Sequence, residues 1–153
     1  MASDWLGMAI DLARRNVARG ARPFASVIVR DDRLVATGVN DVLATGDPTK
    51  HAEIEAVRAA AAALGTPQLD GCVVYASGHP CPMCLAAIHI SGIKEVYYAY
   101  SLEDAERCGF SSAGLYAQMA KPPSQQSIRV VHTPVRASGE SPYELWRRAK
   151  GSA

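Results

Sequence analysis

The fold is decided by residues 72–100, whose sequence is CVVYASGHPCPMCLAAIHISGIKEVYYAY. The β-branched and aromatic run at 72–77 predicts a buried strand, residues 81–91 predict a helix, and residues 95–100 predict another strand. The loop Gly78-His-Pro separates the first strand from the helix. A strand, a helix and a strand in succession form a βαβ unit, which indicates an α/β protein.

The flanking segments continue this alternation. Apolar residues at three- and four-residue steps predict an amphipathic helix from Ser3 to about Arg19, which Gly20 ends. We then expect strands at 26–30 and 33–39 joined by a tight turn, a loop at 40–49 and an alanine-rich helix at 50–64. After the βαβ unit the sequence predicts loop and short helices at 102–119, a strand at 128–132 and a helix at 141–148. That last helix opens with a capping box, Ser141-Pro-Tyr-Glu144.

These elements predict one α/β domain over residues 1–153, in which helices flank both faces of a central mixed five-stranded sheet in three layers. The composition agrees with a globular core, because 48% of the 153 residues are hydrophobic and the formal net charge is only +1. This balance also argues against a dedicated nucleic-acid binder, which normally carries a strongly basic surface.

The sequence also predicts a cytoplasmic protein. The longest apolar runs fall far short of the roughly 20 residues that cross a bilayer, and the first residues include Asp4 where a signal peptide would be basic. In a reducing compartment the cysteines are expected to bind metal or to be buried rather than to form disulfides: Cys72, Cys81, Cys84 and Cys108.

One histidine and two cysteines have the pattern of a metal site. His51 begins one predicted helix, and Cys81 and Cys84 begin another, three positions apart and therefore on one helical face. Thiolate and imidazole are the ligands that zinc prefers, and three protein ligands leave a fourth position open for water. We therefore expect Zn²⁺ as the cofactor.

Glu53 is the expected catalytic residue beside this metal. Two thiolates cancel the charge of the dication, so a neighbouring base is needed to take the proton of a bound water. Two positions after His51, Glu53 points away from the direction of the ligand, which favours a place beside the metal. One alternative is a non-enzymatic zinc protein with a four-ligand structural site, for which Cys108 is the only candidate fourth ligand. The other is a protein without a metal, in which Cys81 and Cys84 pack as small apolar residues.

The segments His51-Ala-Glu53 and Pro80-Cys81-Pro-Met-Cys84 resemble the zinc signature of the cytidine deaminase superfamily. Further segments resemble bacterial guanine deaminases almost from end to end, whereas the resemblance to tRNA adenosine deaminases is concentrated around the zinc segments. The further segments are Pro23-Phe24-Ala-Ser-Val-Ile-Val, Asp47-Pro-Thr-Lys-His-Ala-Glu, Cys-Gly-Phe110, Ala-Lys-Pro122 and Ser141-Pro-Tyr-Glu-Leu-Trp146.

The resemblance implies a cytidine deaminase-like fold and hydrolysis of an amino group on a small heterocycle, with guanine converted to xanthine and ammonia. Glu53 would carry protons from water to the ring nitrogen and to the leaving ammonia. Asn40 lies where family members use an asparagine to hydrogen-bond the base, although a turn-forming role is the alternative. The resemblance also implies a homodimer in which the C-terminal segment crosses to the partner, while no organic cofactor, membrane or nucleic acid is expected.

This chain departs from the family pattern in ways that bear on the substrate. Ser111 and Ser112 stand where guanine deaminases commonly have an aspartate, and a hydroxyl brings no charge to a recognition edge. Isoguanine, cytosine, an aminotriazine, guanosine and, less favourably, tRNA adenosine therefore stay open as substrates. Phe24 is a candidate substrate contact or a core anchor, and His79 stands where most relatives carry glutamate. Four arginines favour a solvated helix face over a patch for RNA: Arg14, Arg15, Arg19 and Arg22.

Overall fold

The computed structural model describes residues 1–135 and 138–151, which belong to two compact units, Met1–Ala120 and Lys121–Ala153. Each unit is described by itself, and the single domain expected over residues 1–153 stays a prediction. The first unit contains, in chain order, α1 (Ala2–Ala18), β1 (Ala25–Arg30), β2 (Arg33–Val39), α2 (Val42–Thr45), α3 (Ala52–Leu64), β3 (Cys72–Gly78), α4 (Pro82–Ile90), β4 (Glu95–Tyr100), α5 (Leu102–Arg107) and α6 (Ala113–Met119). Within the described residues, no helix combines the length and the apolar character that crossing a membrane requires.

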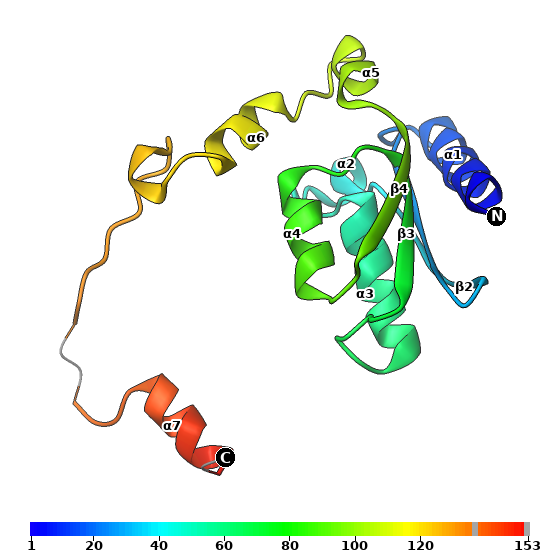
Figure 1. Ribbon diagram of the computed structural model, residues 1–153. Coiled ribbons are helices and arrows are strands. Elements are labelled where there is room, and N and C mark those ends of the chain that lie inside the picture. Colours follow the sequence, from blue (N-terminus) through cyan, green and yellow to red (C-terminus); the bar gives the residue numbers. More distant parts are fainter. Residues whose placement is uncertain (136–137, 152–153) are drawn as a thin grey trace. The chain divides into compact units, whose positions relative to one another are not determined.

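The sheet of the first unit is mixed and has the strand order β2-β1-β3-β4 (Figure 1). β1 pairs antiparallel with both β2 and β3, and β3 pairs parallel with β4, as expected for a βαβ unit. The hairpin between β1 and β2 turns through Asp31 and Asp32, which both adopt the left-handed conformation. Positive φ at both turn residues is typical of the tight two-residue turns whose twist matches that of paired strands.

Helices cover both faces of this sheet, which confirms the three-layer arrangement. Successive residues of β1 point to opposite faces, so that Val27 and Val29 pack with Ala9 of α1, whereas Ile28 packs with Ala56 of α3. α4 lies beside α3 on the same face, as Figure 1 shows. Strand β1 is buried along five of its six residues because its side chains meet a helix layer on either face.

Helix α3 lies unusually close to strand β2 at Gly38. A Cβ atom on Gly38 would lie 2.2 Å from the carbonyl oxygen of Ala52 and 2.4 Å from the amide nitrogen of Ala56. Only glycine therefore permits this approach, which brings the first turn of α3 against the sheet. The residues at that first turn are the ones on which the candidate metal site depends.

The sequence prediction of five strands is wrong, since the sheet has four. Residues 128–132, expected as a strand, lie in the second unit in extended or irregular conformation, with Ile128, Val130 and Val131 exposed. The described part of this unit contains only the short helix η1 (Pro123–Gln125) and α7 (Pro142–Ala149), so the β-branched run has no strand partner within its own unit. A strand forms only where another strand completes its hydrogen-bond ladder, and a pattern of residues cannot supply that partner.

Candidate active site

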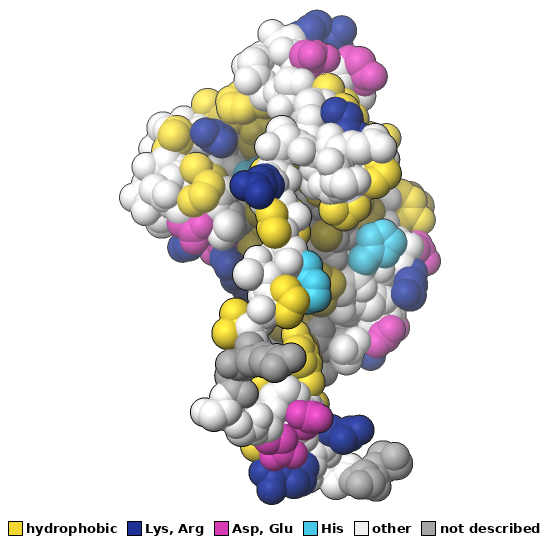
Figure 2. Space-filling model, turned by 90° about the vertical axis from the view of Figure 1, so that its left-hand side faces the viewer, with side chains coloured by type: hydrophobic (Ala, Val, Ile, Leu, Met, Phe, Trp, Pro, Cys, Tyr) yellow, Lys and Arg dark blue, Asp and Glu magenta, His cyan; other side chains and the backbone are white. Residues whose placement is uncertain are grey.

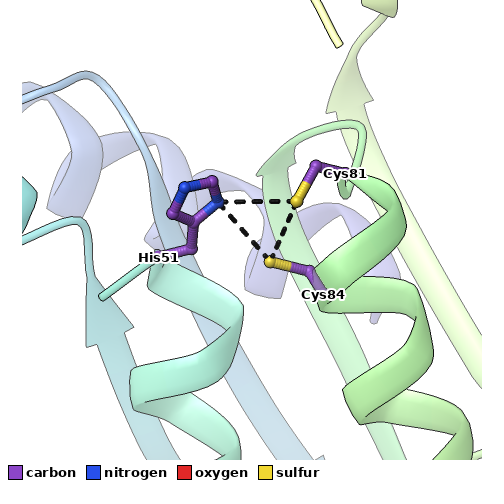
Figure 3. A group of neighbouring side chains, drawn as sticks. All are labelled: His51, Cys81 and Cys84. Atoms are coloured by element: carbon purple, nitrogen blue, oxygen red, sulfur yellow. Dashed lines mark hydrogen bonds between the residues drawn. The ribbon is translucent and has the colours of Figure 1, made fainter. Parts of the chain in front are cut away.

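His51, Cys81 and Cys84 come together from the first turns of two neighbouring helices (Figure 3). His51 is the N-cap of α3 and Cys81 is the N-cap of α4, while Cys84 lies in the first turn of α4. Pro82 at the first position of α4 fixes its backbone angle in advance and lacks the N–H that would be unpaired there. The local sequence therefore points all three side chains toward one place.

The spacing of the three ligand atoms fits one tetrahedral ion. Nδ1 of His51 lies 3.5 Å from Sγ of Cys81 and 3.7 Å from Sγ of Cys84, and the two sulfurs are 3.6 Å apart. A tetrahedral zinc ion, with bonds of about 2.3 Å to sulfur and about 2.0 Å to nitrogen, holds two sulfurs roughly 3.8 Å apart and sulfur and nitrogen roughly 3.5 Å apart. The chemistry of the donor set and its dimensions both suit Zn²⁺, and among the described residues the group offers three ligands.

The electrostatics of the site favour thiolate at Cys81. The side-chain hydrogen bond between Cys81 and Cys84, with a smaller contribution from His51, lowers the pKa of Cys81 to about 4. The positive N-terminal end of α4 acts in the same direction on both cysteines. A cation bound between the two sulfurs would also deprotonate Cys84.

Glu53 lies beside these three residues. It belongs to the first turn of α3, only 7% of its surface is exposed, and its Oε2 accepts a hydrogen bond of 3.2 Å from Sγ of Cys84. Burial raises the pKa of the Glu53 carboxyl above its usual value. Glu55, two positions further on, instead forms ion pairs with Arg58 and Lys50.

A cavity of ≈ 300 Å³ opens onto this cluster. All four substrate-contact candidates from the sequence line it, together with His51, Glu53 and Cys81: Phe24, Asn40, Ser111 and Ser112. Phe24 packs its ring edge-to-face on Phe110 at 5.2 Å, which forms an apolar wall. The cavity thus combines the metal-site cluster, aromatic surface and polar side chains, as a binding site for a small polar heterocycle requires.

Asn40 is buried, and its side-chain orientation is fixed by the backbone. Its Oδ1 accepts a hydrogen bond of 3.3 Å from the amide of Val42, which identifies Nδ2 as the donor end of the amide. Asn16 of α1 donates from its own Nδ2 to the carbonyl oxygens of Asn40 and Arg22, both at 2.8 Å. The side-chain amide of Asn16 therefore holds the backbones of Asn40 and Arg22, which both line the cavity.

The loop before Cys81 is held by two further side chains. Tyr116 of α6 donates a hydrogen bond of 2.6 Å from its hydroxyl to the carbonyl oxygen of Pro80. Nδ1 of His79 lies 2.9 Å from the same oxygen, and the His79 ring packs edge-to-face on Tyr98. His79 also lines the cavity, but it is not a member of the metal-ligand group.

The two remaining cysteines lie outside the metal-ligand group. Cys72 is 2% exposed and belongs to the core, which confirms the sequence interpretation. Cys108 is exposed and lies outside the group formed by His51, Cys81 and Cys84.

Sequence reasoning missed three residues of this site: Asn16, Arg22 and Tyr116. The sequence pattern groups Arg22 with the arginines of the first helix, but α1 ends at Ala18 and Gly20 has a φ of 82°. That glycine was the available signal, since a residue beyond it cannot share the helix face. No sequence signal marks Asn16 or Tyr116, because their partners include backbone carbonyls 24 and 36 residues away in the chain.

Comparison with known proteins agrees with this geometry. Residues 1–100 match the family model described as the cytidine and deoxycytidylate deaminase zinc-binding region. The chain is 40% identical to guanine deaminase from Bacillus subtilis (strain 168) over 94% of its own length and 92% of that protein. It is 27% identical to a tRNA-specific adenosine deaminase from Aquifex aeolicus (strain VF5), over 97% of its own length and 95% of that protein.

Solved structures of guanine deaminases are similar to this chain in fold. The crystal structure of guanine deaminase from Bacillus subtilis superposes with a TM-score of 0.88 at 39% identity, covering 95% of this chain and 93% of that one. A structure of guanine deaminase from Nitrosomonas europaea gives a TM-score of 0.66 at 32% identity, covering 71% of this chain and 64% of that one. The fold and the zinc-ligand set therefore both have counterparts among known proteins.

Proposed function

The chain belongs to the family of the cytidine and deoxycytidylate deaminase zinc-binding region, and we propose that it is a hydrolytic deaminase of a free nucleobase, with guanine as the leading substrate. The reaction joins guanine and water and releases xanthine and ammonia. One observation carries the proposal: a buried carboxyl, Glu53, touches a zinc-ligand set that opens onto a cavity of ≈ 300 Å³. A purely structural zinc site has no use for an acid in that place.

His51, Cys81 and Cys84 hold the metal in this proposal. A zinc ion bound there supplies a Lewis acid that lowers the pKa of a water molecule in the open position. Glu53 would accept a proton from the attacking water and donate it to the ring nitrogen next to the amino-bearing carbon, as the C–O bond forms. Glu53 would then take the proton of the added hydroxyl and deliver it to the amino group, which leaves as ammonia when the C–N bond breaks. Burial raises the pKa of the Glu53 carboxyl above its usual value, so this carboxylate binds a proton more readily than an exposed glutamate does, which suits the exchange.

The substrate contacts follow from the walls of the cavity. Nδ2 of Asn40 donates to a carbonyl oxygen or a ring nitrogen of the base, since Oδ1 of Asn40 already accepts a hydrogen bond from the Val42 amide. Phe24 packs on the ring plane, and the hydroxyls of Ser111 and Ser112 bond the polar edge of the heterocycle. These hydroxyls donate or accept, so they suit several aminated rings.

We propose that two copies of the chain assemble and exchange C-terminal segments. Strand β4 is at the edge of the sheet, and three of its tyrosines, Tyr97, Tyr98 and Tyr100, are 43%, 45% and 49% exposed. The second unit contains the run 128–131, rich in β-branched residues, and the described residues of that unit include no strand to pair with it. An edge strand and an unpaired run of β-branched residues are complementary if the run comes from a second copy. Light scattering is expected to give twice the chain mass of 16.3 kDa for the wild-type protein. For Val130→Glu it is expected to give the mass of a single chain.

The cytoplasm is the proposed location, because the four cysteines are free thiols and two of them belong to the ligand set. Nucleic acid is not a proposed partner. Basic and acidic side chains are interspersed on the face that Figure 2 shows, without a continuous basic stripe among its described residues.

The test is ammonia release by zinc-loaded protein from guanine, isoguanine, adenine, cytosine, ammeline, their nucleosides and an adenosine-bearing RNA hairpin. Glu53→Gln is expected to abolish turnover on the active substrate while one zinc per subunit stays bound. Glu55→Gln is the matched control, since it removes a carboxylate from the same helix turn and leaves activity intact. Zinc binding without turnover of any compound would favour the non-enzymatic zinc protein, and full activity of Glu53→Gln would exclude the mechanism.

A further inference from the structure

Ser111, one of the residues that line the active-site cavity, carries a hydroxyl group whose hydrogen is already in use. Its Oγ lies 3.4 Å from Oε1 of Glu106 and 3.3 Å from the backbone nitrogen of Ala113. A carboxylate only accepts hydrogen bonds and a backbone N–H only donates them, so the hydroxyl donates to Glu106 and accepts from Ala113. One lone pair of Oγ is left over. Ser111 therefore offers an acceptor, not a donor, to a ligand in the cavity.

The backbone at the end of helix α5 holds Glu106 and Ser111 within reach of each other. Gly109, with a φ of 84°, turns the chain back after α5, and its amide donates to the carbonyl oxygen of Glu106 at 2.9 Å. The amide of Phe110 donates to the carbonyl oxygen of Ala105 at 3.0 Å. These two bonds form the Schellman motif of a helix that ends at a left-handed glycine. The contact between Glu106 and Ser111 is thus supported by a defined helix end.

The carboxylate of Glu106 is not shared with a neighbouring cation. Within residues 1–135 and 138–151 it takes part in no ion pair, and the adjacent Arg107 pairs with Asp104. A charged acceptor receives a stronger hydrogen bond than a neutral one does, so it holds the hydroxyl hydrogen of Ser111 more firmly. Glu106 also adds, beside the cavity lining, the negative charge that a hydroxyl lacks.

The acceptor at Ser111 complements the donor at Asn40, which lines the same cavity. Nδ2 is the donor end of the Asn40 amide, because its Oδ1 accepts from the amide of Val42. A lactam, which is a carbonyl group next to a ring N–H, presents one acceptor and one donor, the reverse of this pair. A site with fixed polar groups rejects a ring that leaves one of them unpaired. The two side chains therefore suit a lactam.

We propose that Glu106 is a positioning residue that orients the Ser111 hydroxyl as an acceptor, so that the site selects aminated heterocycles that contain a lactam, guanine among them. The ring N–H of the lactam donates to Oγ of Ser111, and the lactam oxygen accepts from Nδ2 of Asn40. The inference rests on the deaminase function and on the Ser111 contact proposed above, and it names the feature of the substrate that the cavity recognises. Adenine and 2-aminopurine, which lack a lactam, are the disfavoured class.

The experiment compares two pairs of purines that carry the amino group at the same carbon and differ in the lactam: guanine with 2-aminopurine, and isoguanine with adenine. Ammonia release gives kcat/KM for each compound. The fluorescence of 2-aminopurine, and its displacement by guanine, gives dissociation constants independently of turnover. Glu106→Ala is expected to reduce the preference for the lactam member by roughly 3- to 10-fold, the range of one neutral hydrogen bond. Thermal stability should stay unchanged, since Glu106 is exposed.

A double-mutant cycle tests whether Glu106 acts through Ser111. Ser111→Ala is expected to reduce the preference by itself, and Glu106→Ala is expected to add nothing in that background. Glu106→Gln, which keeps an acceptor without the charge, should retain part of the preference. Glu103→Gln is the matched control, because Glu103 is exposed on the same helix and lies outside the cavity lining. It should behave as the wild-type protein does.

Three results would overturn the inference and leave the deaminase function standing. They are an unchanged preference in Glu106→Ala, equal losses on both members of a pair, and additive effects of Glu106→Ala and Ser111→Ala. A loss of preference in Glu103→Gln as large as that in Glu106→Ala would overturn it too, since any charge on α5 would then suffice. If no compound releases ammonia, the proposed function fails, and the fluorescence displacement alone decides whether Glu106 sets the preference. Absence of binding as well would overturn both.

Discussion

Nδ2 of Asn16 donates hydrogen bonds of 2.8 Å to the carbonyl oxygens of both Asn40 and Arg22, and so connects helix α1 to two residues of the active-site cavity. The contact with Asn40 spans 24 residues of chain. Asn16 is buried, and both of its donors and its acceptor are bonded. Helix α1 therefore helps to position two residues of the cavity, although the metal-ligand group contains none of its side chains.

Asn16→Asp tests this connection. The substitution keeps the shape and the acceptor for Arg19 but turns the two donors into a carboxylate that faces two carbonyl oxygens. We expect a loss of about 2–4 kcal/mol in the free energy of unfolding, because two buried acceptors lose their partner, and a higher KM for the substrate. Urea denaturation and steady-state kinetics measure both. Arg14→Ala, on the exposed face of the same helix, is the control and should change neither.

The close contact at Gly38 gives a prediction about the fold and the metal together. In Gly38→Ala the new methyl group meets the backbone of Ala52 and Ala56, so α3 must move away from the sheet. We expect a destabilisation of about 1–3 kcal/mol or more and a weaker affinity for zinc, since His51 begins α3. Gly7→Ala is the matched control, because nothing lies within 4 Å of its Cβ position and α1 gains a better helix former. Equal stability of the two variants would contradict the prediction.

The three-residue ligand set predicts a clear division among the cysteines. Cys81→Ser and Cys84→Ser are expected to lose the bound zinc after dialysis, measured as metal per subunit, and to lose activity with it. Cys108→Ser is expected to keep one zinc per subunit and full activity, because Cys108 is exposed and outside the ligand group. Loss of zinc in Cys108→Ser would identify Cys108 as a fourth ligand and support a structural site.

Substitution of Tyr116 is expected to weaken the zinc site less than the loss of a cysteine ligand does. Tyr116→Phe removes the hydrogen bond to the Pro80 carbonyl, next to Cys81, without changing the shape of the ring. We expect the zinc affinity to fall by roughly 10-fold, as when a residue that orients a ligand is lost, with little change in thermal stability. A competition titration with a zinc chelator measures the affinity. Tyr143→Phe, in the exposed part of α7, serves as the control.

Most of the first unit was predictable from sequence because its signals are local. Gly20 and Gly65 follow the ends of helices α1 and α3, and Asp31-Asp32 occupies the hairpin turn. The metal ligands were predictable for the same reason, since the spacing of Cys81 and Cys84 is a property of one helical turn.

The residues that sequence reasoning missed depend on contacts that no local pattern records. The expected strand at 128–132 has the right residue types, but a strand also needs a partner, and the described residues of its unit include none. Arg22 belongs to the cavity because a buried amide in another element fixes its backbone. Short helix α2 was expected as a loop, because four residues are too few for a helical repeat to be visible.

The two halves of the metal centre also have a consequence for how the protein unfolds. His51 and Cys81 are 30 residues apart and belong to different helices, so an ion held between them closes a loop much as a disulfide does. In a chain-entropy description, closing a loop of this length restricts the unfolded chain by roughly 3–4 kcal/mol. A zinc ion bound there would then act as a reversible cross-link between α3 and α4, one that a chelator rather than a reductant removes.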